Sequence, residues 1–207
     1  MATQVTLTEP ESLVPDSLVV HFGDMLRNIT DDEFFRFCQL NRDLRIERTS
    51  DGEILIMPPT GGDTGRTNSA LNGLLYSWAQ RDGTGITFDS STGFTLANRA
   101  KRSPDAAWVK RSRWDALTKQ QRQEFPPLCP DFVVELRSPT DSLRTLQAKL
   151  REYIANGALL GWLIDPIEKK VYVYRPSAEV TCLDDPKTVS GDPVLPRFVL
   201  DLQRLWA

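Results

Sequence analysis

Two short apolar runs, each carrying an acidic residue, mark the central part of the chain. Residues 103–109 and 130–137 are rich in Val, Phe and Trp and are bounded by proline or basic residues. This pattern is typical of mostly buried strands in a mixed sheet. An ionised carboxylate inside such a strand is unfavourable unless a cation, a proton or a strong hydrogen-bond donor compensates it. We therefore expect Asp105 and Glu135 each to have a partner.

The second strand places an acid and a base on one face. Side chains alternate between the two faces of a strand, so Glu135 and Arg137 point the same way, and so does Asp131 at the start of the strand. If the two strands pair, Asp105 lies beside Glu135, and two carboxylates around a hard cation make a magnesium or manganese site. Asp131 is a second candidate for the metal-binding acid, because it shares the face of Glu135 and also follows a proline.

A helix is predicted directly after the second strand, over residues 142–156. Its apolar positions recur at helical spacing along one stripe, made of Leu143, Leu146, Leu150, Tyr153 and Ile154. Lys149 lies at the edge of this stripe. From there its side chain either folds back over the strand ends toward the carboxylates or extends into water.

The N-terminal part of the chain predicts a helix followed by a hairpin. Residues 30–33 have the sequence of a capping box and open a helix that ends near residue 41. The residues expected to face inward are Phe34, Phe37 and either Cys38 or Leu40. Residues 45–48 and 53–57 then flank a turn and predict a β-hairpin. Glu47 lies just before that turn, where a glutamate is either a surface residue or part of a site.

The remaining segments alternate helices and strands. A loop at 58–62 precedes a helix that ends near residue 81, and the apolar stripe of this helix consists of Ala70, Leu71, Leu74, Leu75 and Trp78. Strands are expected at 86–89, 93–96, 159–164 and 171–174, and short polar helices at 114–117 and 118–125. The tail, residues 194–206, alternates proline, phenylalanine and leucine, and we expect it to cover one edge of the sheet.

Length and cysteine usage indicate the class of protein. At 207 residues the chain suits a single domain over residues 1–207, with residues 1–23 as an extended N-terminal arm. The three cysteines, Cys38, Cys129 and Cys182, have neither disulfide nor zinc spacing, which indicates a reducing interior. The N-terminus lacks the basic-then-apolar order of a secretory signal, and no apolar run is long enough to cross a bilayer. We therefore expect a cytoplasmic protein without a membrane partner.

The scarcity of histidine argues against several kinds of active site. His21 is the only histidine in the chain, and a single imidazole near the chain start is typical of packing. Serine–histidine triads, histidine–zinc sites and histidine–metal nucleases are therefore disfavoured. Carboxylates and lysine remain as the candidates for catalysis.

Charge is distributed unevenly around Asp105. A net charge of −3 argues against a protein that coats nucleic acid indiscriminately, because such binding relies on many phosphate contacts. Six basic residues nevertheless flank Asp105 in the sequence, namely Arg99, Lys101, Arg102, Lys110, Arg111 and Arg113. They form either a basic collar that steers a polyanion toward the site or a set of solvated loop residues.

Four segments together resemble a known family. They are RSPDAAWV at 102–109, CPDFVVELRSP at 129–139, LQAKLREYIANG at 146–157 and GWLIDP at 161–166. The order of Pro-Asp on one strand, acid-x-base on the next and then a helix is similar to the PD-(D/E)xK nuclease superfamily, and the segments resemble the Uma-type putative endonuclease family within it. The resemblance extends from about residue 30 to residue 206. It implies a restriction-endonuclease-like α/β fold, a mixed sheet flanked by helices, and a magnesium- or manganese-dependent endonuclease activity.

The resemblance also implies roles for individual residues. Asp105 matches the first metal-binding acid of the superfamily and Glu135 the second. Arg137 stands where the superfamily has lysine, and because an arginine keeps its proton, it can clamp a phosphate but cannot act as a base. Lys149 matches a lysine that the family carries on the following helix, and Glu47 matches an acid on an early strand.

These features support three hypotheses about function. The first is metal-assisted hydrolysis of a phosphodiester, in which Asp105 and Glu135 hold the ion and Lys149 acts on the attacking water. Arg137 is then a second donor, and nucleic acid, DNA in particular, is the partner. The second is a binding protein of the same fold, in which Arg137 and Lys149 neutralise the acids as salt bridges. The third is a protein-interaction module whose exposed aromatic residues contact a partner, with a homodimer as one option.

Overall fold

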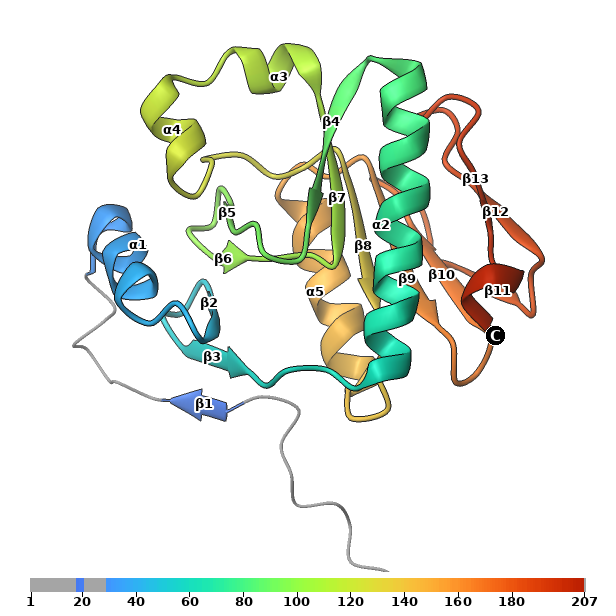
Figure 1. The fold of residues 1–207 in the computed structure, drawn as a ribbon, viewed down its shortest axis with the longest axis horizontal. Helices are drawn as coiled ribbons and strands as arrows, with labels where there is room; N and C mark the ends of the chain where they lie inside the picture. Colours follow the sequence, from blue (N-terminus) through green and yellow to red (C-terminus); the bar gives the residue numbers. More distant parts are fainter. Residues whose placement is uncertain (1–17, 21–28, 207) are drawn as a thin grey trace, which may run out of the picture.

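The structure of the chain, a computed structural model, describes residues 18–20 and 29–206. Its centre is a six-stranded sheet in the order β11-β10-β9-β8-β7-β4 (Figure 1). The strands are β4 (Gly85–Asp89), β7 (Ala106–Lys110), β8 (Phe132–Leu136), β9 (Leu160–Asp165), β10 (Lys170–Tyr174) and β11 (Thr181–Asp184). β8 and β9 run parallel and the other neighbours run antiparallel, so the sheet is mixed, as the sequence predicts.

The two faces of this sheet carry separate hydrophobic cores. Alternation along β8 turns Phe132 toward one core and Val133 toward the other. The predicted apolar stripe of α2 (Gly62–Asp82) completes the first core, and α5 (Leu143–Ala155) completes the second. The two helices therefore lie on opposite faces of the sheet, which is the flanked arrangement that the sequence predicts (Figure 1).

The helix α5 connects β8 to its parallel neighbour β9 and covers the second core. Ser142 caps its N-terminus, and Leu150 and Tyr153 are fully buried on the predicted stripe. The helix packs closely on β9 because Gly161 has no side chain: a Cβ there would lie 2.7 Å from Leu150 Cδ1. A larger residue at position 161 would therefore clash with the buried face of α5, the helix that carries Lys149.

The C-terminal tail packs on the α2 face of the sheet. It contains β12 (Thr188–Ser190), β13 (Val199–Asp201) and α6 (Gln203–Trp206), and the two strands pair antiparallel. Its buried residues Leu195, Phe198, Leu200, Leu202 and Leu205 belong to the same core as α2. The prediction that the tail covers a sheet edge is therefore wrong. The edges are β4 and β11, and the tail buries its apolar side chains on the face instead.

A five-stranded sheet is built around the predicted hairpin. Its order is β1-β3-β2-β6-β5, with β1 (Leu18–Val20), β2 (Arg45–Arg48), β3 (Ile54–Met57), β5 (Phe94–Thr95) and β6 (Lys101–Arg102). Strand β2 pairs antiparallel with β3, as expected of a hairpin, and with β6 on its other side. Alternation along β2 turns Ile46 and Arg48 toward the helix α1 (Asp31–Leu40), and turns Glu47 toward α5.

The helix α1 covers the outer face of this second sheet. The predicted capping box is present, because Thr30 Oγ1 accepts a hydrogen bond from Glu33 N and the Glu33 carboxylate accepts one from Thr30 N at 2.8 Å. Phe34 is fully buried, whereas Leu40 is 78% exposed. Cys38 packs against the core, so it takes the inward position that the sequence left open.

The connection between β7 and β8 contains two short helices, α3 (Arg111–Asp115) and α4 (Lys119–Gln123), close to their predicted positions. In the described ranges 18–20 and 29–206, no helix combines the length and the apolar character needed to cross a membrane. His21 and most of residues 1–23 lie outside the described residues, and residues 18–20 form β1.

Candidate active site

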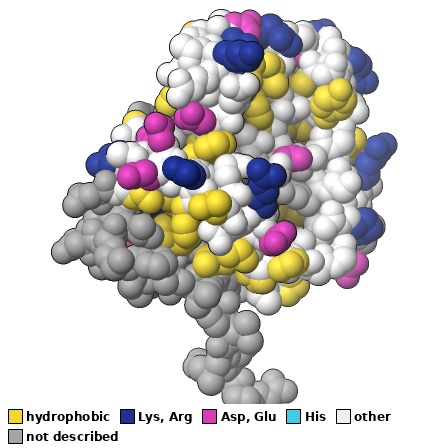
Figure 2. All heavy atoms as spheres, turned by 60° about the vertical axis from the view of Figure 1, so that its left-hand side comes forward, with side chains coloured by type: hydrophobic (Ala, Val, Ile, Leu, Met, Phe, Trp, Pro, Cys, Tyr) yellow, Lys and Arg dark blue, Asp and Glu magenta, His cyan; other side chains and the backbone are white. Residues whose placement is uncertain are grey.

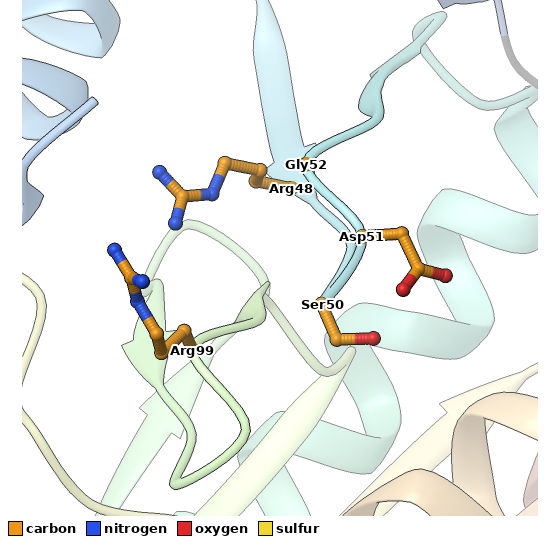
Figure 3. Close-up of a pocket in the computed structure, with 5 residues that line it drawn as sticks. All are labelled: Arg48, Ser50, Asp51, Gly52 and Arg99. Atoms are coloured by element: carbon orange, nitrogen blue, oxygen red, sulfur yellow. The ribbon is translucent and has the colours of Figure 1, made fainter. Parts of the chain in front are cut away.

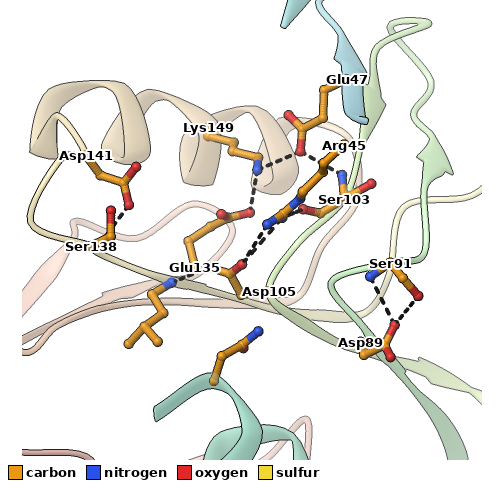
Figure 4. A network of polar contacts seen from close by, with 12 residues as sticks. Arg45, Glu47, Asp89, Ser91, Ser103, Asp105, Glu135, Ser138, Asp141 and Lys149 are labelled. Atoms are coloured by element: carbon orange, nitrogen blue, oxygen red, sulfur yellow. Dashed lines mark hydrogen bonds and ion pairs between the residues drawn. The ribbon is translucent and has the colours of Figure 1, made fainter. Parts of the chain in front are cut away.

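Asp105 and Glu135 lie side by side on the α5 face of the six-stranded sheet (Figure 4). The antiparallel register of β7 and β8 pairs Ala106 with Val134, so the next position outward brings Asp105 opposite Glu135. The Leu136 N–H donates to Asp105 Oδ2 at 2.8 Å, which ties the residue before β7 to the end of β8. The structure thus brings together the two acids that the sequence singles out.

Lys149 reaches these carboxylates from α5. Its Nζ lies 2.9 Å from Glu135 Oε1 and 2.9 Å from Glu47 Oε1, and its side chain is 11% exposed (Figure 4). The Lys149 side chain therefore folds over the sheet toward the carboxylates and does not extend into water. Tyr153, one helical turn further on, donates its hydroxyl to Glu135 Oε1 at 3.1 Å.

Glu47 is a buried member of the same group. It is 2% exposed, accepts a hydrogen bond from Ser103 N at 2.9 Å, and pairs with Arg102 at 3.1 Å as well as with Lys149. From the sequence, Glu47 was either a surface residue or part of the site, and its burial excludes the surface position. Because β2 lies between β3 and β6 and faces α5, a side chain on its inner face is shielded from water.

Two arginines complete the pairing of the acids. Arg102 lies between two glutamates, with Nη1 3.1 Å from Glu47 Oε2 and Nε 2.6 Å from Glu152 Oε2. Arg45 lies 3.4 Å from Asp105 Oδ1. Each acid thus has a cation within ion-pair distance. We refer to these residues together as the carboxylate cluster, made of Arg45, Glu47, Arg102, Asp105, Glu135, Lys149 and Glu152.

Periodicity points to some members that the sequence analysis did not assign to the site. Arg45 precedes Glu47 by two positions, which is the spacing of one strand face. Tyr153 follows Lys149 by four positions, which is the spacing of one helix face. Glu152 follows Lys149 by three positions, which is also the spacing of one helix face. The residues added by the structure are Arg45, Arg102, Glu152 and Tyr153.

Burial and unequal pairing separate the pKa values of the two glutamates. Burial, with the charges of Asp105 and Glu47, raises the pKa of Glu135 to about 7, and the Lys149 ammonium opposes this shift. Burial acts on Glu47 as well, but Lys149 and Arg102 outweigh it and lower the pKa of Glu47 to about 2. Burial also lowers the pKa of Lys149, and the two glutamates more than compensate, so that its pKa is raised. Near neutral pH Lys149 is therefore charged, and Glu135 is balanced between its two forms.

Asp131 and Arg137 lie at opposite ends of β8 and are paired elsewhere. Asp131 accepts a hydrogen bond from Lys110 N at 2.8 Å and pairs with Arg113 at 2.9 Å. Arg137 pairs with the buried Asp165 at 2.8 Å. Neither residue shares a described hydrogen bond or ion pair with the carboxylate cluster. Of the predicted site residues, the structure thus brings together Asp105, Glu135, Lys149 and Glu47, and it holds Arg137 in a separate pair.

The basic residues that flank Asp105 in the sequence do not form one exposed collar. Lys101 is 2% exposed and pairs with Asp31 at 2.6 Å, and Arg102 is 12% exposed within the carboxylate cluster. Arg99, by contrast, is exposed. On the face shown in Figure 2, Lys and Arg side chains are scattered among acidic and apolar ones. Arg102 thus serves as the partner of a buried acid, Glu47, whereas Lys101 is itself buried and pairs with the exposed Asp31.

The carboxylates suit a hard divalent cation. Among residues 18–20 and 29–206, no three histidine, cysteine, aspartate or glutamate side chains are grouped so that they could hold a metal ion. Magnesium does not require three, because it is commonly held by one or two carboxylates and completes its shell with water and phosphate oxygens. Asp105 and Glu135 supply two adjacent carboxylates, and the carboxylate cluster has four acids for three cations. The pair therefore fits one such ion, whose two positive charges would more than offset the one negative charge left in the cluster.

Comparisons with known proteins cover most of the chain. Residues 31–203 match the model of the Uma2 family, whose description is "Putative restriction endonuclease". Among solved structures, the chain is similar to a putative nuclease belonging to DUF820 from Anabaena variabilis, with a TM-score of 0.69 and 23% sequence identity over 86% of this chain and 97% of that chain. At that identity the similarity concerns the fold. No curated protein matches the chain.

Proposed function

The chain belongs to the Uma2 family, and from this premise we propose that it is a divalent-metal-dependent endonuclease that hydrolyses phosphodiester bonds in DNA. The family resemblance predicted from the sequence is confirmed, and family membership supports a nuclease role. The observation that carries the finer proposal is the meeting of Asp105, Glu135 and Lys149 at one point on the sheet.

In this proposal Asp105 and Glu135 hold a magnesium or manganese ion. When bound, such an ion neutralises the nonbridging oxygens of the phosphate and lowers the pKa of an attacking water. The raised pKa of Glu135 supports the assignment, because a carboxyl group that is buried, and lies beside other acids, is stabilised in its charged form by an added cation. The Leu136 N–H keeps the Asp105 carboxylate oriented, and Arg45 lies at the longer distance of 3.4 Å.

Lys149 serves as a donor and not as a base. The pKa of Lys149 is raised by the two glutamates, so its ammonium keeps its proton near neutral pH. The ammonium therefore orients the attacking water or offsets the negative charge that develops on the phosphate oxygens. Glu47 acts through Lys149 and is a positioning residue, because the ion pair at 2.9 Å holds the ammonium over the sheet.

A nucleic-acid-binding protein without catalysis is the second candidate, and the pairing around Glu135 favours it. Glu135 Oε1 already has Lys149 and Tyr153 as partners. Arg137 pairs with Asp165, so it does not take the place of the missing lysine beside Glu135. In such a protein the acids are structural members of buried ion pairs. Cleavage that depends on a divalent ion separates the two candidates.

Nicking of supercoiled plasmid DNA tests the proposal. The protein is expected to nick DNA with magnesium or manganese and not with EDTA. Asp105→Asn or Glu135→Gln is expected to reduce the single-turnover rate by roughly a hundredfold or more, because the ion contributes several kcal/mol to the transition state. Asp184→Asn, which changes an exposed acid on β11, is expected to cleave at the unaltered rate. DNA binding without metal-dependent cleavage would favour the second candidate.

A further inference from the structure

A pocket of about 390 Å³ lies on the other side of β2 from the carboxylate cluster. It is lined by Arg48, Ser50, Asp51, Gly52 and Arg99 (Figure 3). Arg48 is the last residue of β2 and follows Glu47, and the two side chains point to opposite faces of the strand. Residues 50–52 form the turn of the β2–β3 hairpin, and Arg99 comes from the turn between β5 and β6. The pocket is thus separate from the carboxylate cluster, although both are built on β2.

Arg48 is a buried cation with an unused hydrogen-bond donor. It is 3% exposed, its guanidinium carbon lies 5.5 Å from the centre of the Phe34 ring, and Nη1 donates to Ile29 O at 3.3 Å. The Nε–H is buried and has no partner within the described part of the chain. A buried donor without an acceptor costs free energy, and more so on a charged group. An acceptor brought by a ligand would remove this cost.

Positive charge around the pocket exceeds negative charge. Lys101 lies directly opposite Arg48 across β2 and β6, and like charges at such positions repel. Asp31 pairs with Lys101 at 2.6 Å, which leaves Arg48 and Arg99 without an ion pair among the described residues. Burial lowers the pKa of Arg48, the Asp31 carboxylate opposes this shift, and the charge of Arg99 adds to it. A negatively charged ligand would relieve this repulsion.

Arg99 completes the pocket from a strained turn. Its φ of 69° lies in the left-handed region, which residues other than glycine, asparagine and aspartate rarely adopt. In Figure 3 its guanidinium points into the same space as that of Arg48, whereas the carboxylate of Asp51 points away from both. Because Arg99 is exposed and Arg48 is buried, a ligand in the pocket meets one arginine at the mouth and the other inside.

We propose that this pocket is a phosphate-binding site, separate from the catalytic residues, in which Arg48 and Arg99 bind one phosphate group. A guanidinium presents paired N–H donors in a planar fork that matches the oxygens of a phosphate. The volume of the pocket lies within the range typical of ligand sites, about 300–1,000 Å³. Free phosphate, a nucleotide and the backbone of a polynucleotide all supply this chemistry.

Titration with inorganic phosphate, in EDTA and at constant ionic strength, tests the site directly. Calorimetry on the full chain is expected to show saturable binding that potassium chloride does not reproduce. Arg99→Ala is expected to weaken it by roughly tenfold or more, the effect of losing a charge-assisted hydrogen bond. Arg81→Ala, which changes an exposed arginine in the last turn of α2, is expected to leave it unchanged. Asp51→Asn is expected to tighten it, because a negative charge leaves the pocket lining.

The tighter binding expected of Asp51→Asn keeps the test independent of folding defects, since a misfolded variant does not gain affinity. The proposal is overturned if phosphate binds no better than chloride, or if Arg99→Ala and Arg81→Ala bind phosphate alike. A labelled oligonucleotide, titrated in EDTA, then identifies the source of the phosphate. Weaker oligonucleotide binding by Arg99→Ala assigns the pocket to backbone phosphate, and unchanged binding assigns it to free phosphate or a nucleotide. Neither measurement involves cleavage, so the outcome does not depend on the proposed endonuclease activity.

Discussion

Glu47 Oε1 and Lys149 Nζ lie 2.9 Å apart, although 102 positions separate the two residues in the sequence. Glu47 belongs to the five-stranded sheet, and Lys149 belongs to the helix that covers the six-stranded sheet. Arg102 and Glu152 make a second contact of this kind at 2.6 Å. These ion pairs join the two sheets close to the point where Asp105 and Glu135 meet. The geometry of the candidate site therefore depends on how the sheets pack.

Replacing Glu47 by glutamine is expected to destabilise the protein by about 3–5 kcal/mol, the usual cost of removing one partner from a buried ion pair. The change leaves Lys149 and Arg102 with one countercharge fewer. Unfolding in urea, followed by circular dichroism, measures the effect. Glu179→Gln, at an exposed position, is the control and is expected to change stability by less than about 0.5 kcal/mol. Equal unfolding midpoints for the two variants would contradict the role of Glu47 in joining the sheets.

Lys149→Met is expected to slow metal-dependent cleavage by roughly 10²–10³-fold, the range seen when a donor to the developing charge is removed. Oligonucleotide binding in EDTA is expected to change little, because the lysine acts in the chemical step. Single-turnover nicking and fluorescence anisotropy measure the two quantities on protein whose fold is checked by circular dichroism. Lys149→Arg keeps the charge beside Glu47 and Glu135, so its cleavage rate is expected to lie between those of Lys149→Met and the unaltered protein. Cleavage by Lys149→Met at the unaltered rate would exclude the proposed role.

In EDTA, Glu135 is expected to make the protein less stable as the pH rises from 4.5 to 7. Its pKa is raised from 4.5 to about 7, so in this window the folded protein binds more protons than the unfolded chain. The effect is on the order of a few kcal/mol. Glu47 acts at lower pH: its pKa is lowered to about 2, so its contribution is lost as the pH falls below 4.5. Urea midpoints measured across this range in Glu135→Gln are expected to lack the decline between pH 4.5 and 7, and an unchanged decline would contradict the assignment.

Binding of manganese is expected to release protons near pH 7. Glu135 is partly protonated there, since its pKa is raised to about 7, and a metal ion requires the carboxylate form. Calorimetry in buffers of different ionisation enthalpy measures the released protons. Asp105→Asn is expected to weaken binding by more than roughly tenfold, a loss typical even of outer partners of a metal site. Asp131 is the other acid considered for the metal, and it lies at the far end of β8, so Asp131→Asn is expected to bind manganese normally. Weakened binding by Asp131→Asn together with normal binding by Asp105→Asn would assign the metal to Asp131.

Gly161→Ala is expected to destabilise the protein by about 1–3 kcal/mol, the usual cost of overpacking a core. The added Cβ would lie 2.7 Å from Leu150 Cδ1, on a fully buried side chain between α5 and β9. Gly73→Ala in α2 is the matched control, because nothing lies within 4 Å of its added Cβ. Alanine is the better helix former by about 1 kcal/mol, so Gly73→Ala is expected to raise stability. Thermal unfolding measures both, and a rise for both would show that α5 does not need this close approach.

The sequence by itself determined the features that depend on near neighbours. The capping box at Thr30, the apolar stripe of α5 and the alternation along β8 all follow from contacts between residues two to four positions apart. These patterns placed Glu135 on one face of its strand and Lys149 on the helix that follows, and the family resemblance selected Asp105 as the other acid. That the strands of Asp105 and Glu135 pair was an assumption, which the structure confirms.

Only the tertiary structure decided which partner each charge has. The sequence left Glu47 between surface and site, grouped Arg137 with Glu135, and set the tail at a sheet edge. In the structure Glu47 is buried against Lys149, Arg137 pairs with Asp165, and the tail packs on the α2 face. A buried charge is compensated by whichever opposite charge the packing brings near. That packing brings together residues from two sheets far apart in the chain, which the periodicity of a single strand or helix does not encode.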